Sequence, residues 1–282
     1  MHGVKPVARP EAATVYVPPG RFLLGKVEFK GQCNNNDIVI RLDGTLVAPS
    51  DYNVIGDDGN WLMFEHVNGV SINGGTLDGQ GAGLWTCKKT GKSCPSGATT
   101  LEFSNSNNIV RKGLRFQPPA SSPNTDGIHV QSSSDVTIMN SRIGTGDDCV
   151  SIGPGATNLW IENVACGPGH GIRQIFIKTL VVLARIKKEA GVQNVTVKTA
   201  TFTGTQNGAS GVKISDVKYQ DIHGTSRSEV AVKFDCSSRY PCSGISLEDV
   251  KLTYNNQPAK ASCSHADGSV SGVVQPNSCL LQ

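Results

Sequence analysis

The chain has 282 residues, including 32 glycines, 17% charged residues and 38% hydrophobic residues. Average globular proteins contain about 7% glycine and about 25% charged residues, so this chain is rich in glycine and poor in charge. Its hydrophobic content can supply a core and excludes a disordered chain. The glycine content is atypical of a coiled coil or a helical bundle. We therefore expect a β-rich protein with many turns.

The formal net charge of +3 is too small to indicate a partner among nucleic acids, because nucleic-acid-binding domains usually carry a clustered basic face. No run of about 20 apolar residues is present, so the sequence predicts no membrane span. The first residues lack the apolar segment of a secretory signal. We expect neither nucleic acid nor a membrane as a partner.

Short segments in which Val, Ile or Leu alternates with polar residues recur along the chain. In chain order they cover residues 68–75, 108–113, 135–140, 158–163, 193–198, 211–217 and 244–250. The period of two is typical of a strand with one buried face. The interval from Asp135 to Asn158 is 23 residues, and repeats of about 20 to 50 residues indicate a solenoid or a propeller.

A propeller would need blades of about 40 residues with a Trp-Asp or kelch signature, and the sequence has neither. We therefore predict an all-β chain that forms a single right-handed parallel β-helix over residues 1–282, with the handedness of parallel crossovers. Residues 1–13 are expected to be irregular and the strands to be two to six residues long. Residues 172–190 break the pattern: their apolar residues fit either one helix face or a strand pair.

The nine cysteines include four pairs of near neighbours, which are Cys87 and Cys94, Cys149 and Cys166, Cys236 and Cys242, and Cys263 and Cys279. Without a Cys-x-x-Cys motif or adjacent histidines, this spacing favours disulfides over a zinc site. Disulfides indicate an oxidising compartment, so we expect a secreted protein whose natural chain begins upstream of this sequence. Cys33 is expected to be unpaired.

Three acidic residues and a histidine follow one another at intervals of about one coil. Asp126 precedes Asp147 by 21 residues and Asp148 by 22, and Asp147 precedes His170 by 23. Neighbouring strands lie about 4.8 Å apart, so these side chains should cluster on adjacent coils. Paired carboxyl groups separated by about 6.5–9.5 Å are typical of inverting glycosidases. Crowding should raise the pKa of at least one of them.

The motifs at residues 124–127 (Asn-Thr-Asp-Gly), 146–149 (Gly-Asp-Asp-Cys) and 166–171 (Cys-Gly-Pro-Gly-His-Gly) resemble those of polygalacturonases of glycoside hydrolase family 28. The similarity extends over most of the chain and is greatest to the plant pollen-type branch. It implies a secreted right-handed parallel β-helix of the cell wall. By the same resemblance, the protein would hydrolyse α-1,4-galacturonosyl bonds of pectin or polygalacturonic acid with inversion. It would act as a monomer and without a metal or other cofactor.

By this resemblance, Asp147 matches the general acid, while Asp126 and Asp148 match the carboxylates that activate water. His170 matches the active-site histidine and Asn124 a substrate-binding residue. The resemblance also implies a disulfide between Cys149 and Cys166.

The chain departs from the family pattern at three places. The Arg-Ile-Lys clamp that should follow residues 206–208 is missing, with Lys213 as a distant replacement. About one coil is absent between Phe116 and Ser122, and residues 172–188 replace a short strand. We treat the Arg-Ile-Lys at 185–187 as unrelated to the clamp.

These departures predict poor or absent hydrolysis. The alternative is a non-catalytic pectin-binding or inactive β-helix; a calcium-dependent pectate lyase is a third, weaker alternative.

Overall fold

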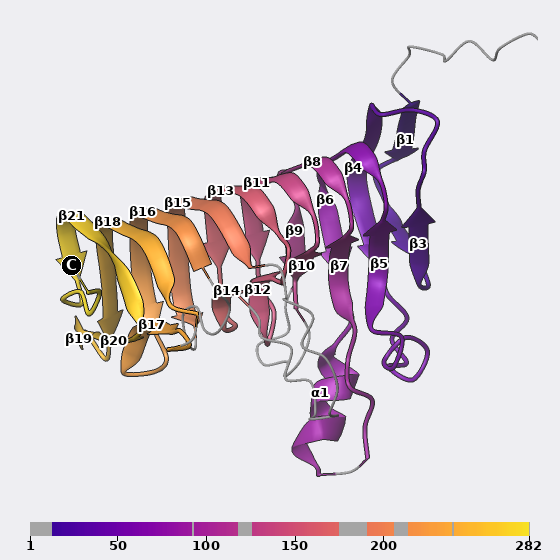
Figure 1. Ribbon diagram of the computed structural model, residues 1–282. Coiled ribbons are helices and arrows are strands. Elements are labelled where there is room, and N and C mark those ends of the chain that lie inside the picture. Colours follow the sequence, from indigo (N-terminus) through magenta and orange to yellow (C-terminus); the bar gives the residue numbers. More distant parts are fainter. Residues whose placement is uncertain are drawn as a thin grey trace, which may run out of the picture.

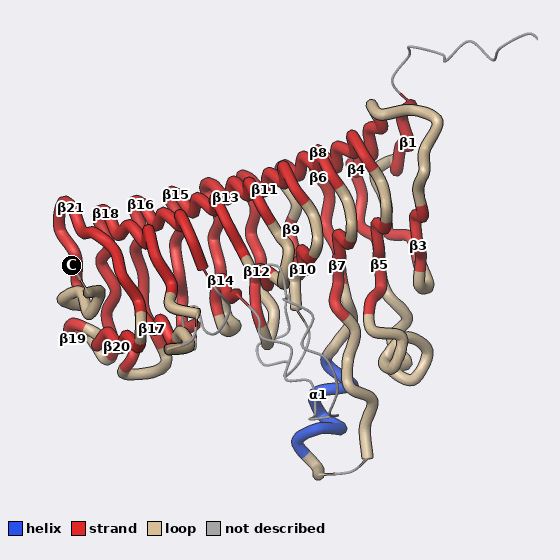
Figure 2. Tube along the Cα trace, in the orientation of Figure 1, coloured by secondary structure: helices blue, strands red, loops and turns tan. Residues whose placement is uncertain are grey.

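The computed structural model describes residues 13–91, 93–117, 126–174, 191–205, 214–238 and 240–281. Their strands stack as successive coils of an elongated solenoid, from β1 at one end to β21 at the other (Figure 1). Strands form both walls of the solenoid, and the helix α1 (Ala82–Lys89) projects from it (Figure 2). The predicted parallel β-helix is confirmed. No helix among the described residues is long and apolar enough to cross a membrane.

The first sheet has the order β1-β4-β6-β8-β11-β13-β15-β16-β18-β19, with β2, β9 and β21 attached. Its strands are β1 (Ala13–Val17), β2 (Arg21–Leu23), β4 (Ile38–Val47), β6 (Asn68–Asp78), β8 (Asn107–Lys112), β9 (Arg115–Gln117), β11 (Ser134–Ile143), β13 (Thr157–Cys166), β15 (Val192–Thr205), β16 (Ile214–Ser226), β18 (Cys242–Tyr254), β19 (Gln257–Pro258) and β21 (Ala266–Gln275). All its pairings are parallel except that of β18 with β19.

The second sheet has the order β14-β12-β10-β7-β5-β3, and β17 and β20 form a separate parallel pair. Its strands are β3 (Val27–Lys30), β5 (Asn60–Glu65), β7 (Thr99–Ser104), β10 (Ile128–Gln131), β12 (Asp148–Ile152) and β14 (Gly171–Gln174); the pair consists of β17 (Val230–Asp235) and β20 (Lys260–Ser264). Ala13 is already part of β1, which corrects the prediction of an irregular segment over residues 1–13. Residues 172–174 belong to a strand, while residues 1–12 and 175–190 lie outside the described part.

The longest strands of the first sheet exceed the predicted six residues, because single left-handed residues bend them without ending the pairing. Asn140 in β11 and Asn163 in β13 have φ values of 52°. Asparagine tolerates this conformation better than most residues. The Asn163 side chain donates to the Asn140 Oδ1 atom at 2.8 Å. Stacked asparagines of this kind hold the bend of one coil directly above the bend of the next. The strands therefore continue through the bend and reach 10 to 14 residues.

The interior of the solenoid consists of apolar side chains stacked in register. Val136, for example, pairs with Ile109 on one side and with Leu159 on the other, and all three are at most 2% exposed. Arg111 is the exception, since it is fully buried between Ile72 and Ile138. Its three guanidinium nitrogens have no hydrogen-bond partner among the described residues. Burial lowers the pKa of Arg111 to about 9.

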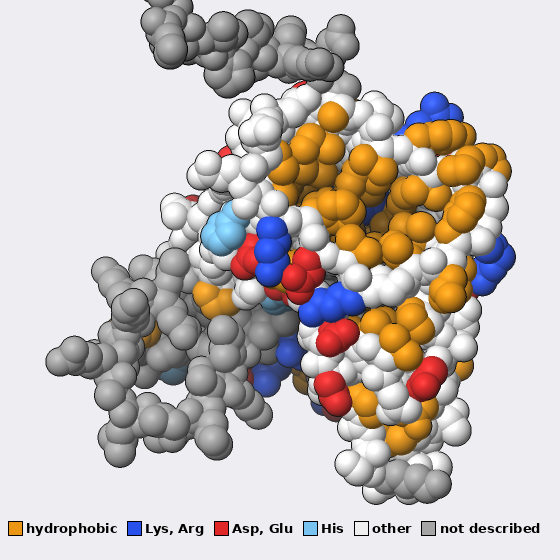
Figure 3. Space-filling view, turned by 90° about the vertical axis from the view of Figure 1, so that its right-hand side faces the viewer, with side chains coloured by type: hydrophobic (Ala, Val, Ile, Leu, Met, Phe, Trp, Pro, Cys, Tyr) orange, Lys and Arg blue, Asp and Glu red, His pale blue; other side chains and the backbone are white. Residues whose placement is uncertain are grey.

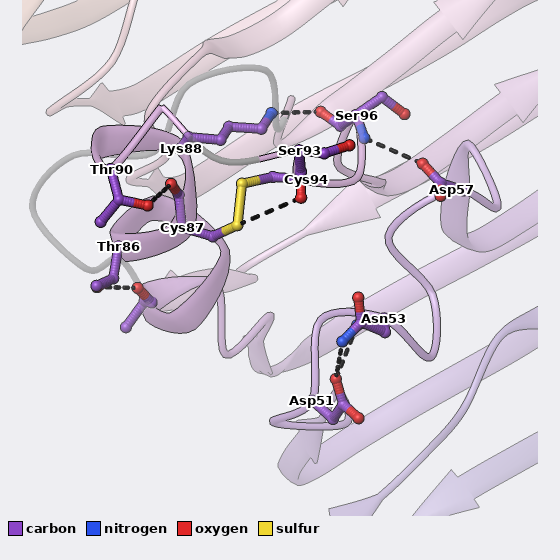
Figure 4. Close-up of a disulfide and its surroundings, with 11 residues drawn as sticks. Asp51, Asn53, Asp57, Thr86, Cys87, Lys88, Thr90, Ser93, Cys94 and Ser96 are labelled. Atoms are coloured by element: carbon purple, nitrogen blue, oxygen red, sulfur yellow. Dashed lines mark hydrogen bonds between the residues drawn. A yellow bond between two sulfur atoms is a disulfide. The ribbon is translucent and has the colours of Figure 1, made fainter.

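The four cysteine pairs expected from the sequence are disulfide-bonded in the structure, and Cys33 is a free thiol. The bridge between Cys149 and Cys166 joins adjacent coils in the core, with a Cα–Cα distance of 5.9 Å. The bridge between Cys87 and Cys94 ties the end of α1 to the following loop (Figure 4). This helix was not predicted from the sequence.

In two parts of the solenoid, no strand of the described residues covers the apolar side chains. At the β1–β3 end, hydrophobic side chains gather on the surface (Figure 3), and Leu23 is 75% exposed. Among the described residues, the second sheet is interrupted after β14, and the next strand on this side, β17, belongs to the separate pair with β20. A cavity of about 70 Å³ lies at this interruption, lined by apolar residues that include Ile172, Phe202 and Phe234.

Candidate active site

The acidic residues and the histidine singled out in the sequence lie together at the edge of the second sheet. Asp126 precedes β10, Asp147 and Asp148 lie at the start of β12, and His170 precedes β14. The Asp126 Oδ1 atom accepts a hydrogen bond from the Asp148 backbone N–H at 3.3 Å. The His170 Nδ1 atom is 2.8 Å from Asp147 Oδ1 and 4.0 Å from Asp148 Oδ1. Three adjacent coils therefore contribute to one cluster.

Close backbone packing fixes the positions of these side chains. Gly127 donates its N–H to the Asp148 carbonyl at 2.8 Å, and a Cβ atom there would come within 2.7 Å of the Cys149 carbonyl oxygen. Gly169 has a φ of +154°, and a Cβ atom there would lie 2.5 Å from the Asp147 carbonyl oxygen. Only glycine lets the coils approach this closely. The buried disulfide of Cys149 anchors the same strand from the core side.

The Asp148 carboxyl group is buried and shares the site with two other acids. Its side chain is only 1% exposed, and its Oδ1 atom has no hydrogen-bond partner in the described part of the chain. Burial, followed by the charge of Asp126, raises the pKa of Asp148 to about 8. Arg173 opposes this rise, with its Nε atom 3.2 Å from Asp148 Oδ2. The pKa of Asp126 is also raised by burial, against the hydrogen bond from Ser151.

The histidine and a lysine supply positive charge on the outer side of the cluster. The hydrogen bond with Asp147 raises the pKa of His170, which lies at the rim of the cluster. The side chains of His170 and Asp147 are 29% and 13% exposed, respectively. On α1, burial lowers the pKa of Lys88, and the nearby Asp147 carboxylate opposes that change. The projecting helix therefore brings a cation toward the cluster.

Three side chains of this site were not predicted from the sequence, namely His129, Ser151 and Arg173. They are register partners on β10, β12 and β14. Their spacing is 22 residues from each to the next, the same coil-length interval that identified the acids. Arg173 lies in the segment, residues 172–190, that breaks the strand pattern in the sequence. Two predicted substrate-binding residues, Asn124 and Lys213, lie outside the described residues, as do residues 185–187 and 206–208.

Ligand atoms of Asp147, Asp148 and His170 lie within 4.8 Å of one another. His170 Nδ1, however, already faces the Asp147 carboxyl group at 2.8 Å. We assign no metal ligands here.

Comparison with known proteins identifies the family of this chain. The model of glycosyl hydrolases family 28 matches residues 8–115, 92–209 and 204–274. A polygalacturonase of Prunus persica is 52% identical over 98% of this chain and 87% of its own length. An exopolygalacturonase of Zea mays is 32% identical over 95% of this chain and 82% of its own length.

Solved structures show the same fold. An endo-xylogalacturonan hydrolase from Aspergillus tubingensis superimposes with a TM-score of 0.64 at 20% identity, covering 92% of this chain and 84% of the other. A polygalacturonase from Erwinia carotovora superimposes with a TM-score of 0.54 at 20% identity, covering 91% and 89%.

The alignment with the Prunus persica relative also reveals internal gaps. It runs over 347 positions, which is 65 more than the 282 residues of this chain. At least 65 positions of the relative therefore have no counterpart here, which fits the coils that the sequence indicates are missing. The match nevertheless extends along nearly the whole chain. The chain belongs to glycoside hydrolase family 28 and is a polygalacturonase-type, pectin-degrading hydrolase.

Proposed function

We propose that this chain hydrolyses α-1,4-galacturonosyl bonds of polygalacturonic acid with inversion, using Asp126, Asp147, Asp148 and His170. The observation that carries the proposal is the convergence of these four side chains from three adjacent coils. The partly exposed Asp147 and His170 face incoming substrate, while Asp148 lies deeper. A deep and a shallow carboxyl group allow attack and departure on opposite faces of the sugar ring.

In the proposed reaction, Asp147 is the general acid and gives its proton to the glycosidic oxygen as the C1–O bond breaks. A water molecule held by Asp126 and Asp148 forms the new C1–O bond from the other face and loses a proton to the carboxylates. The buried Asp148 Oδ1 atom, which lacks a partner among the described residues, is a suitable acceptor for that water. His170 orients Asp147 through their 2.8 Å contact.

The electrostatics of the cluster supply the proton that the acid needs. The raised pKa values of Asp126 and Asp148 mean that the cluster retains a proton at mildly acidic pH. Interacting carboxyl groups titrate together, so this proton belongs to the group of three acids. His170 Nδ1 lies between Asp147 and Asp148, and its positive charge favours proton release from Asp147 during the reaction. We expect activity to fall as the pH rises toward 8.

Substrate binding is expected to be weaker than in relatives with a complete clamp. Polygalacturonate carries one carboxylate per sugar, and charge-assisted hydrogen bonds to arginine or lysine would hold it. Arg173 and Lys88 bring positive charge to the site, but the region of the expected clamp, residues 206–213, lies outside the described residues. We therefore keep the expectation of lower turnover than in a relative with the Arg-Ile-Lys motif.

Release of reducing ends from polygalacturonate at about pH 5 tests the proposal. Asp147→Asn should lose at least about 100-fold in kcat, the usual contribution of general acid catalysis. Asp267→Asn, an exposed acid of β21, is the matched control and should keep full activity. Retention of wild-type turnover by Asp147→Asn would overturn the assignment. Binding of polygalacturonate without release would revive the non-catalytic alternative, which the family comparison does not favour.

The location and assembly of the protein are part of the same proposal. Pectin is a cell-wall polymer, and four disulfides suit an oxidising, extracellular compartment. We infer a secreted monomer that acts at the cell wall on an acidic polysaccharide, with no nucleic-acid or membrane partner.

A further inference from the structure

A chain of short hydrogen bonds links Asp126 to two residues that neither the motifs nor the proposed reaction use. Ser151 on β12 donates its hydroxyl proton to Asp126 Oδ2 at 2.6 Å. The same Oγ atom lies 2.7 Å from the Nδ1 atom of His129 on β10. His129 and Ser151 are register partners on adjacent coils, and Ser151 is fully buried. The three groups therefore form one chain along the second sheet.

Because serine has a single hydroxyl proton, the hydrogen bonds from His129 through Ser151 to Asp126 all run in one direction. Because Ser151 donates to Asp126, its Oγ atom can only accept from His129, so Nδ1 of His129 must carry a proton. When Asp126 itself gains a proton, the order reverses: Asp126 donates to Ser151, and Ser151 donates to an unprotonated Nδ1. The first direction accompanies an ionised Asp126, and the reverse direction accompanies a protonated Asp126.

The surroundings hold the imidazole ring in place. Gly153 lies directly beside His129, and a Cβ atom at this glycine would be 3.3 Å from the ring Cε1 atom and 2.9 Å from the Gln131 Cβ atom. Gln131 in turn donates to Glu102 Oε1 at 3.1 Å, and Glu102 is the register partner of His129 on β7. The ring is therefore packed against two neighbouring strands.

We propose that His129 and Ser151 are positioning residues that form a hydrogen-bond relay and hold Asp126 ionised and oriented as the base that accepts the proton from water. This inference rests on the proposed function, since it names how one of its carboxylates is prepared. The relay counters the burial of Asp126 and the negative charge of Asp147, which both raise its pKa. The charged and titratable groups around it are His129, Glu102, Asp147, Asp148, His170 and Arg173.

Ser151→Ala should move the acidic limb of the kcat/KM profile to higher pH. A hydrogen bond to a charged group contributes about 1.5–3 kcal/mol, which corresponds to about 1 to 2 pH units. We expect kcat at pH 5 to fall about 10- to 100-fold and to recover as the pH rises toward 7, with KM nearly unchanged. His129→Leu should shift the limb in the same direction, whereas His129→Asn, whose amide can donate from the Nδ1 position, should largely restore it.

Ser141→Ala is the matched control. Ser141 is a buried serine of β11 on the other sheet, and its hydroxyl donates to the Met139 carbonyl at 2.8 Å. This variant should leave the pH profile unchanged. A Ser151→Ala enzyme that loses activity equally at all pH values, with an unmoved acidic limb, would show a merely structural role and overturn the relay.

A measurement that does not need turnover separates this inference from the proposed function. The carboxyl ¹³C resonance of Asp126, assigned with Asp126→Asn, should titrate about 1 to 2 pH units higher in Ser151→Ala than in the wild type. An inactive wild-type chain that still shows this shift would refute the proposed function and leave the relay intact. An unshifted titration would overturn the relay, whatever the activity.

Discussion

Replacing the buried Arg111 with isoleucine should stabilise the protein substantially. Its side chain lies between Ile72 and Ile138 in the core, without a hydrogen-bond partner among the described residues. Burial lowers its pKa from 12.5 to about 9. At about 1.4 kcal/mol per pH unit, the folded state disfavours the charged form by about 5 kcal/mol. An isoleucine side chain is apolar like its neighbours Ile72 and Ile138. We subtract about 1 kcal/mol from the gain in stability, because isoleucine is smaller than arginine and packs the site less completely.

The expected gain is therefore about 4 kcal/mol in the free energy of unfolding at pH 7. For a chain of this size, 1 kcal/mol changes the Tm by about 2 °C, so Arg111→Ile should melt about 8 °C higher by differential scanning fluorimetry. The folded wild type binds fewer protons than its unfolded chain between pH 9 and 12.5, so its stability rises with pH there. The difference in Tm between Arg111→Ile and the wild type should consequently become smaller above pH 9.

Arg142→Ile, at an exposed position of β11, is the control and should change the Tm by no more than about 1 °C. A properly folded Arg111→Ile protein with an unchanged or lower Tm would refute the reasoning. It would show that the guanidinium group is compensated inside the solenoid.

Two further predictions concern the site and its anchor. The wild type should lose stability as the pH rises from 4 to 8, because Asp148 has a raised folded-state pKa of about 8 and must ionise while buried. Asp148→Asn should abolish hydrolysis and should remove up to about 5 kcal/mol of this pH-dependent loss in the free energy of unfolding. Equal profiles of Tm against pH for the variant and the wild type, from pH 4 to 9, would contradict the prediction. Replacing both Cys149 and Cys166 with serine should lower the free energy of unfolding by about 2–4 kcal/mol; an unchanged urea midpoint would contradict this.

Much of the fold followed from alternation and spacing, since both are local properties of the chain. Apolar residues at every second position mark the strands, and a 23-residue interval marks one coil. The strand lengths could not be predicted in the same way. Turn residues such as Asn140 and Asn163 look like strand breakers in a sequence, but stacked left-handed asparagines bend a strand without ending it.

The candidate site could be predicted in part for the same reason. Coil-length spacing identified Asp126, Asp147, Asp148 and His170, and would have identified Ser151 had it been applied to every polar residue. Even the burial of Arg111 follows from the alternation, because Arg111 lies two residues after the inward-facing Ile109 of the same strand. Residues two apart in a strand point to the same face of the sheet. The pKa values depend on burial and on neighbours from other coils, which a sequence does not specify.

The interruption of the second sheet among the described residues has a consequence for where the molecule begins to unfold. In a stack of coils, each coil is stabilised only by its immediate neighbours, so the weakest junction determines where opening begins. At the β15–β16 junction, the described residues pair through one sheet, whereas the coils of the candidate site, from β7 to β14, pair through two. We expect the backbone amides of β16 to β21 to exchange with deuterium as one unit, ahead of β7 to β14. The coils of the candidate site would then keep their structure while the C-terminal coils separate from them.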